Sequence, residues 1–337
     1  MKILYIFGNG FDINLGLKTR YIDFYEYYMS IDHKTELIRK LKNEISEGIT
    51  TWADLELALG DYTKNINTQE EFEEIYYDIA DNLGDYLEKK EKEFDFEKAS
   101  IDVFFECLCF PELFLSQRDI NELRSFNTQW NKNQWDVNII TLNYTRSIEK
   151  ILGDRKIDFR IGIHNGYEIL IKGLQHIHGY TDDRMIMGVN DMSQISNVNF
   201  HKNEEITDAL IKANCNMVQR HTIDDLCVNQ ISKSNLICIF GSSIGDTDNN
   251  WWELIGEQLK KDNSTRLIIF SKGDEIKQRF GQKKVVQQKI IKNLFLSKTA
   301  LNDEEKKSVI NNIYVGVNTD IFNLVPVSAS VQLVPTN

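Results

Sequence analysis

The sequence has little proline, no paired cysteine motif and no long hydrophobic run. Its 3 prolines form no proline-rich linker that would mark a domain boundary. Its 5 cysteines are an odd number without a C-x-x-C pair, which argues against a disulfide or zinc framework and predicts reduced thiols in the core. No stretch approaches the roughly 18 unbroken apolar residues of a membrane span, and the start has no signal-peptide pattern. We therefore expect a cytoplasmic protein that does not enter the membrane.

Basic residues are outnumbered by acidic ones. Lys and Arg total 39 against 51 Asp and Glu, a formal net charge of -12. A protein of this sign repels polyanions at long range, which argues against an extended nucleic-acid-binding face. A small anionic ligand held by backbone amides stays compatible with this charge. The hydrophobic fraction of 42% and the charged fraction of 27% are those of ordinary globular proteins, so we expect a folded chain.

Short apolar runs that end in turn residues predict an α/β fold with a Rossmann-like, mostly parallel sheet. The run from Lys2 to Phe7 stops at a glycine and predicts the first strand, with the helix of Tyr21, Phe24, Tyr25 and Tyr28 packed on it. Further strands are expected at residues 137–141, 159–163, 169–177, 185–189, 236–240 and 266–270. Further helices are expected at about residues 204–230 and 249–261.

A long helical segment interrupts the predicted sheet. Residues 33–135 keep an apolar spacing of three and four between two strand-like runs. We therefore predict a nucleotide-binding domain made of residues 1–32 and 136–325, with residues 33–135 as a helical insertion covering one side of its crevice. Residues 326–337 form an apolar C-terminal tail to which we assign no function.

The first strand runs directly into Gly8-Asn9-Gly10-Phe11-Asp12. Glycines here let the backbone turn sharply and bring its amides to an anion, so we predict that residues 8–11 hold the phosphates of a nucleotide. A Gly10→Val variant is expected to fold but to lose the ligand. The segment fits neither a dehydrogenase fingerprint nor a P-loop, because Gly16 comes six residues after Gly10 and Leu17 precedes Lys18. A plain tight turn is the alternative.

Polar residues also follow three later strands. Asn143 comes two residues after one strand, His178 closes another, and Gly241, Ser242 and Ser243 follow a third. Because parallel strands end at one edge of a sheet, these residues can meet over one crevice. The glycine and the two serines would reach a second phosphate or a ribose, and Asp248 would contact the ligand or cap the next helix.

Several segments together resemble the bacteriophage abortive-infection AbiH family, over residues 3 to about 252. They are, in order, Gly8-Asn9-Gly10-Phe11-Asp12, Gly16-Leu17-Lys18-Thr19 with Tyr21, Trp52-Ala53-Asp54-Leu55-Glu56, Asn143-Tyr144-Thr145, His176-Ile177-His178-Gly179, Gly188-Val189-Asn190-Asp191 and Gly241-Ser242-Ser243-Ile244-Gly245-Asp246-Thr247-Asp248. More remotely, the same order of motifs is similar to the sirtuin fold, including sirtuin-like NAD hydrolases of phage defence.

The resemblance implies an NAD-type pocket in which NAD is the substrate, its nicotinamide-ribose bond is cleaved and no metal is needed. Asn143 and His178 match the catalytic Asn and His of that fold. Asn143 would order ribose or water, and His178 would act as the base. Asp12 would bond a ribose hydroxyl or stabilise the developing cation, or else cap the turn. The chain departs from sirtuins at Asn9, Asp12 and Thr145 and lacks their paired zinc cysteines, so protein deacylation is not expected.

Two further residues and two rival functions stay open. We expect a structural role for His176, which should face away from His178, and we favour one for Glu56 over a place in the pocket. One rival is a nuclease or other nucleotide-processing enzyme using Asp12, Asp191, Asp246 and Asp248. The other is a non-catalytic nucleotide-sensing module whose helical insertion binds a partner. A phage trigger, a partner protein and a homo-oligomer stay open as partners.

Overall fold

The computed structural model describes residues 1–326 except 154, 262–263, 274–276 and 278–280. Its centre is a sheet of the order β3-β4-β2-β1-β5-β6-β7. The strands are β1 (Lys2–Phe7), β2 (Trp135–Thr141), β3 (Phe159–His164), β4 (Tyr167–His176), β5 (Leu236–Phe240), β6 (Arg266–Ser271) and β7 (Ile313–Val317). Strands β3 and β4 pair antiparallel, and the other pairs are parallel. The predicted α/β class with a mostly parallel sheet is confirmed.

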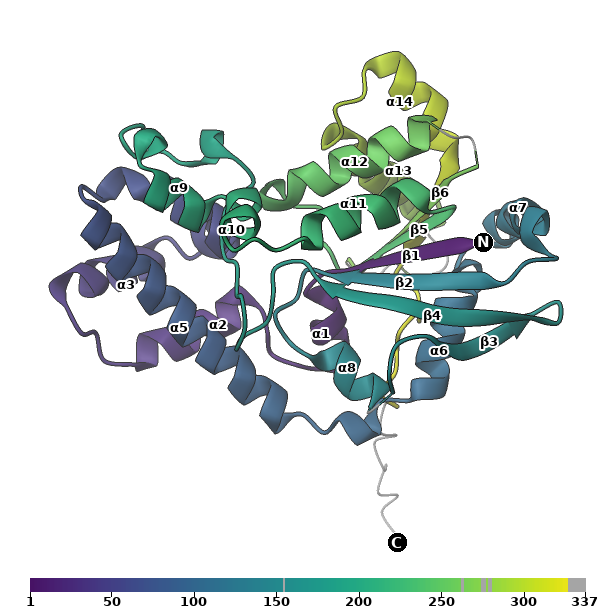
Figure 1. Ribbon diagram of the computed structural model, residues 1–337, viewed down its shortest axis with the longest axis horizontal. Helices are drawn as coiled ribbons and strands as arrows, with labels where there is room; N and C mark the ends of the chain where they lie inside the picture. The colour runs from purple at the N-terminus through teal and green to yellow at the C-terminus, as the bar shows by residue number, and fades with distance from the viewer. Residues whose placement is uncertain (154, 262–263, 274–276, 278–280, 327–337) are drawn as a thin grey trace, which may run out of the picture.

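Helices cover both faces of this sheet and form a lobe beyond one end of its strands (Figure 1). They are α1 (Gly10–Leu15), α2 (Tyr21–Ser30), α3 (Glu36–Glu47), α4 (Leu55–Tyr62), α5 (Gln69–Glu93), α6 (Ile101–Cys109), α7 (Gln117–Asn127), α8 (Ser147–Leu152), α9 (Glu204–Leu210), α10 (Lys212–Val218), α11 (Ile223–Lys233), α12 (Asn249–Lys261), α13 (Gly281–Ser297) and α14 (Asp303–Val309). No helix in the described part of the chain has the length and apolar character needed to span a bilayer.

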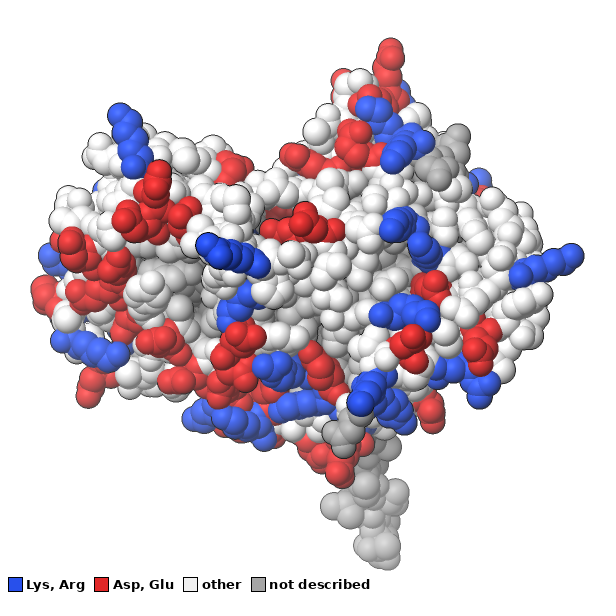
Figure 2. All heavy atoms as spheres, viewed as in Figure 1, with Lys and Arg blue, Asp and Glu red and all other residues white. Residues whose placement is uncertain are grey.

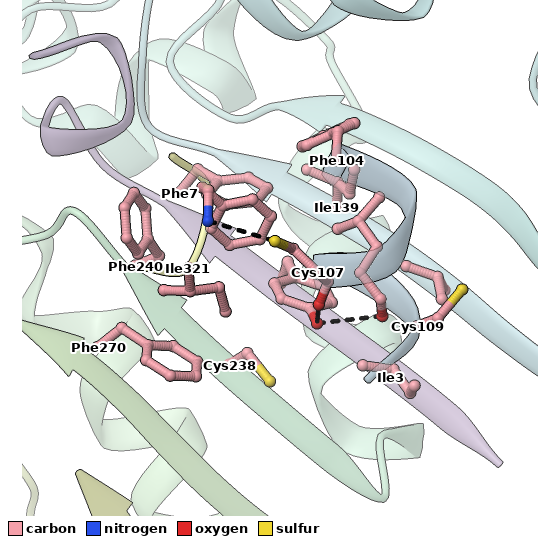
Figure 3. Packing of buried hydrophobic residues seen from close by; sticks show 14 of the residues in the cluster. Ile3, Phe7, Phe104, Cys107, Cys109, Ile139, Cys238, Phe240, Phe270 and Ile321 are labelled. Atoms are coloured by element: carbon pink, nitrogen blue, oxygen red, sulfur yellow. Dashed lines mark hydrogen bonds between the residues drawn. The ribbon is translucent and has the colours of Figure 1, made fainter. Parts of the chain in front are cut away.

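The two faces of β1 bury their side chains in different apolar clusters. Ile3, Tyr5 and Phe7 pack with α1, α6 and α8, and Figure 3 shows part of this cluster around Phe7. Leu4 and Ile6 pack with α11, α12 and α13 on the other face. All five cysteines are free and buried, as expected for core thiols. Strands buried on both faces carry apolar residues at every position, which explains why these runs are recognisable in the sequence.

A separate apolar cluster forms the core of the helical lobe, which we define as α2 to α5 together with α9 and α10. In Figure 1 this lobe lies beyond the carboxyl ends of the strands. Residues 33–134 contain helices and no strand, as predicted, but α6 packs on the sheet instead of joining the lobe. The prediction that α2 packs on β1 is wrong, because Phe24, Tyr25 and Tyr28 are buried in the lobe cluster.

The strand expected at residues 185–189 is not formed. The segment is extended, but its pairing is limited to an isolated bridge between Val189 and Ile211. Met187 and Val189 are buried in the apolar cluster of the helical lobe, away from the clusters on the two faces of the sheet. An apolar run therefore marks burial here, and burial can be supplied by helices as well as by a sheet.

The strand order changes direction at β1. The chain leaves β1 to form β2, β3 and β4 on one side, and then crosses to form β5, β6 and β7 on the other. The carboxyl ends of β1 and β5 therefore flank a topological switch point, where open α/β sheets bind their ligands. Both strands end in a predicted glycine turn.

Candidate functional site

The glycine turns after β1 and β5 pack directly against each other. The amide of Gly10 donates to the Gly241 carbonyl at 2.7 Å, and the amide of Gly8 donates to the Phe240 carbonyl at 3.0 Å. A Cβ atom on Gly10 would lie 2.5 Å from the Gly241 Cα, and Gly241 itself has φ +71°. Only glycine fits this backbone contact. The expectation that Gly10→Val folds normally is therefore wrong, because the added side chain meets backbone that cannot move aside.

The turns contain amides that form internal hydrogen bonds and amides that do not. Besides those of Gly8 and Gly10, the Phe11 amide is used internally and donates to the Gly8 carbonyl at 2.9 Å. No hydrogen bond within the described residues uses the amides of Asn9, Ser242 or Ser243. The residues predicted to hold phosphate thus include both amides that hydrogen-bond the two turns to each other and amides that are left without a partner among the described residues.

The side chains of these turn residues differ in what they can offer a ligand. Asn9 is bonded to Thr19, whose carbonyl accepts from Nδ2 at 2.7 Å and whose hydroxyl donates to Oδ1 at 2.5 Å. Phe11 is fully buried against Phe7, with ring centroids 4.7 Å apart. The Ser242 hydroxyl accepts from the Ile244 amide at 3.0 Å, whereas Ser243 is exposed. Asn9 and Phe11 therefore shape the turn with their side chains.

Asp12 lies buried on α1 next to the segment that follows β2. The Thr145 hydroxyl donates to Oδ2 at 2.6 Å, and Oδ1 is buried with no hydrogen-bond partner among the described residues. Burial raises the pKa of Asp12 to about 6, although the hydroxyls of Thr145 and Ser147 and the side chain of Asn143 oppose this rise. Asp12 can therefore exchange a proton near neutral pH.

Asn143 stands beside Asp12 with part of its side chain unused. Its backbone amide donates to Thr141 Oγ1 at 3.1 Å, and its carbonyl contacts His176 Nδ1 at 3.0 Å. The side-chain oxygen Oδ1 is buried without a partner among the described residues. A buried acceptor of this kind normally has a partner, so Asp12 and Asn143 together offer two oxygens that a hydroxyl or water could satisfy.

His178 is held by Asp248 at the end of the neighbouring strand. Its Nε2 lies 2.9 Å from Asp248 Oδ1, and its Nδ1 is buried without a hydrogen bond in the described structure. The register of β2 with β4 pairs Thr141 with His176, so Asn143 and His178 follow the same edge. They nevertheless belong to two groups, since Asn143 contacts the Asp12 group and His178 contacts Asp248.

Lys212 joins Asp248 to the helical lobe, a role that the sequence analysis missed. Its Nζ lies 2.8 Å from Glu56 Oε2 and 2.9 Å from Asp248 Oδ1, and Tyr144 donates to Glu56 Oε1 at 2.9 Å. Burial would raise the pKa of Asp248, but Lys212 and His178 hold it below its usual range. Burial would lower the pKa of Lys212, but the two carboxylates keep it above its usual value. We call Glu56, Lys212, Asp248 and His178 the charged network.

The remaining polar residues of this edge have local partners. His176 contacts Asn143 and Glu149 Oε1, the latter at 2.9 Å, and its ring lies 4.1 Å from that of Tyr180, in line with the structural role expected for it. Asp191 accepts from the Ser193 amide at 2.8 Å, and Asp246 pairs with Lys298. No group of three or more His, Cys, Asp and Glu side chains in the described chain is arranged to hold a metal ion.

Acidic side chains also dominate part of the outer surface. Figure 2 shows Asp and Glu gathered over the helical lobe on the face that it presents. This distribution agrees with the net charge of -12 and leaves no broad basic region on that part of this face.

Comparison with known families agrees with the motifs of the sequence. The family model described as Bacteriophage abortive infection AbiH matches residues 4–270, which include both glycine turns, Asn143 and the whole charged network. A search among curated proteins finds no match to the chain.

Proposed function

Since the chain belongs to the bacteriophage abortive-infection AbiH family, which gives it an antiphage role, we propose that it acts by cleaving the nicotinamide-ribose bond of NAD. One observation carries the proposal: the topological switch point lies between β1 and β5, the two strands that end in packed glycine turns. The amides of Asn9, Ser242 and Ser243 point to a way of binding the phosphates, because they donate to no described residue.

The reaction breaks the bond between the ribose carbon and the nicotinamide nitrogen. The bonding electrons leave with nicotinamide, positive charge develops on the ribose, and water then adds to the ribose carbon and releases a proton. Asn143 would orient the ribose or the water through its unused side-chain oxygen. Asp12, charged above its pKa of about 6, would stabilise the cation, and His178 would take the proton at Nδ1.

The test is NAD consumption by the purified full chain, followed as released nicotinamide. The variant His178→Ala should lose activity by about a hundredfold to ten-thousandfold with a modest change in NAD affinity. Asn143→Ala should also lose turnover more than NAD affinity. His201→Ala is the matched control, because His201 bonds the Ile195 carbonyl at 2.8 Å within the lobe region. If the wild type leaves NAD intact even with extract of phage-infected cells, the hydrolase proposal fails.

A nucleotide-sensing role without turnover is the second candidate. It is favoured by the burial of His178, which is 4% exposed in this structure. Calorimetry with NAD distinguishes the two candidates, since a sensor binds NAD and releases no nicotinamide. The nuclease alternative finds less support, because Asp12, Asp191, Asp246 and Asp248 each contact different partners.

A further inference from the structure

We propose that Lys212 and Glu56, both supplied by the helical lobe, are positioning residues that set the charge state of His178 through Asp248. This inference rests on the proposed function only in giving His178 the role of base. No hydrogen bond or ion pair among the described residues joins Lys212 or Glu56 to residues 8–11 or 241–243. Both act through Asp248 Oδ1, which lies 2.9 Å from both Lys212 Nζ and His178 Nε2.

The position of Lys212 is not explained by its own helix. Lys212 is the first residue of α10, where the helix dipole disfavours a positive charge. It also interrupts the otherwise apolar run from Ala209 to Ala213 and is only 7% exposed. Burying an ammonium group is costly unless it is paired, and here two carboxylates pair with it. The pairing with Glu56 and Asp248 therefore explains why a lysine is buried at this position, and the helix does not explain it.

The charges of the network balance only when His178 is protonated. Glu56 and Asp248 are anionic and Lys212 is cationic, so neutral His178 leaves one net negative charge and imidazolium leaves none. The network therefore has a place for the one positive charge that a protonated His178 brings. Removing either lobe residue changes this balance by one charge, in opposite directions.

Other charged groups near the network are fixed by separate contacts. Asp224, which is close enough for His178 to lower its pKa against the effect of burial, accepts from Asn216 at 2.9 Å. Arg184 donates to Asn216 Oδ1 at 2.6 Å and to the His176 carbonyl at 2.7 Å. On α4, Asp54 caps the helix by accepting from the Leu57 amide at 3.1 Å. The contacts of Asp224 and Arg184 involve neither Glu56 nor Lys212, whereas Asp54 senses both, because Glu56 raises its pKa and Lys212 lowers it. These two effects on Asp54 oppose each other, so they cancel best in the variant that changes both residues.

The experiment is an NMR titration of the His178 ring in the full chain labelled with ¹³C-histidine, assigned with His178→Ala. Lys212→Met should move the titration midpoint of His178 up by roughly one pH unit, and Glu56→Gln should move it down by a similar amount. The double variant removes a neutral pair and should return the midpoint to near the wild-type value. Where NAD is consumed, the acid limb of the pH-rate profile should follow these shifts.

Lys42→Met is the matched control. Lys42 is buried to a similar degree, 8% exposed, and bonds the carbonyls of Tyr28 and Ile31 within the lobe. It should lower stability without moving the His178 midpoint. Lys212→Arg keeps the charge and supplies the comparison if Lys212→Met does not fold, with an expected midpoint close to the wild type.

The inference is overturned if Glu56→Gln leaves the His178 midpoint unchanged or shifts it in the same direction as Lys212→Met, or if the double variant does not return it. Those results would leave the network as a structural link between lobe and sheet. Because the titration needs no turnover, its outcome is separate from that of the NAD assay. Opposite shifts without NAD consumption would support the positioning role and reject the hydrolase proposal.

Discussion

At the scale of single residues, the two glycine turns are predictable from sequence and their contact with each other is not. A glycine directly after an apolar run indicates a sharp turn at the end of a strand. That Gly10 lies against Gly241 depends on β1 and β5 being neighbours, and these strands are far apart in the chain. Gly10 and Gly241 therefore serve backbone packing, and a ligand is proposed to bind the amides of Asn9, Ser242 and Ser243 instead.

This contact predicts a large loss of stability for Gly10→Ala. Its Cβ would stand 2.5 Å from the Gly241 Cα and 2.7 Å from the Gly241 carbonyl oxygen, so the two turns must separate. We expect a loss of about 3 kcal/mol or more in the free energy of unfolding, measured in urea. The control is Gly84→Ala in α5, whose added Cβ meets nothing closer than 3.4 Å and should be neutral or slightly stabilising. Equal free energies of unfolding for Gly10→Ala and Gly84→Ala would contradict the close packing of Gly10 on Gly241.

Asp12 predicts a pH dependence of stability. Burial raises the pKa of Asp12 from 3.8 to about 6. The protonated side chain therefore makes its full contribution to the free energy of unfolding below pH 3.8, and this contribution is lost as the pH rises through 6. Asp12→Asn removes this loss while keeping the shape of the side chain. The variant should therefore gain about 2 kcal/mol relative to the wild type between about pH 4.5 and pH 7.5. A stability difference that is the same at both pH values would show that Asp12 is not buried as a shifted carboxyl.

Residue patterns in the sequence reveal some site residues and not others. Asn143 and His178 follow strands, and the parallel sheet brings strand ends to one side, so their place beyond the carboxyl ends is predictable. Their separation into the Asp12 group and the charged network is not predictable from the sequence. Lys212 follows no strand. The signal in the sequence is a lysine inside the apolar run Ala209–Ala213, and only the fold identifies Glu56 and Asp248 as the carboxylates that pair with it.

At the scale of elements, buried parallel strands are the part of the fold that sequence predicts best. Strands β1, β2, β5 and β6 lie within a residue or two of the expected runs. Strand β7 is also buried and parallel, yet it is absent from the expected strands. The other failures concern partners: the 185–189 segment and α2 have the expected apolar pattern, but both are buried in the helical lobe. Periodicity records that a face is covered and does not record which element covers it.

The C-terminal end of α5 connects the lobe to the sheet domain. Glu91 Oε2 accepts from the Arg146 amide at 2.6 Å, at the start of α8, and Oε1 lies 2.7 Å from Lys150 Nζ. Glu91→Ala should lower the free energy of unfolding by about 1 to 3 kcal/mol, because a charged acceptor is lost from a helix start. Glu93→Ala is the control: its side chain is 50% exposed and, among the described residues, its ion pair is with Lys90, so its effect should be clearly smaller than that of Glu91→Ala. Similar losses in both variants would refute this account of α5.

At the scale of the whole molecule, the chain has a sheet domain and a lobe with separate apolar cores. The lobe cluster shares no member with the clusters on the two faces of the sheet. Their connection includes the charged network and Tyr144, which follows β2 but has its ring in the lobe cluster and its hydroxyl 2.9 Å from both Glu56 Oε1 and the Ile186 carbonyl. Polar links of this kind allow one part to open while the other stays folded.

Hydrogen exchange should therefore resolve two cooperative units. Amides of α2, α3 and α4 should exchange together, with a lower opening free energy than the amides of β1 and β5, which lie at the centre of the sheet. Tyr144→Ala removes an aromatic ring from the lobe core and a hydrogen bond to Glu56. It should therefore speed hydrogen exchange of the lobe amides and leave the exchange of β1 and β5 unchanged. The sheet amides serve as the internal control. If Tyr144→Ala accelerates both regions equally, the molecule opens as one unit, and the charged network then belongs to a single continuous core.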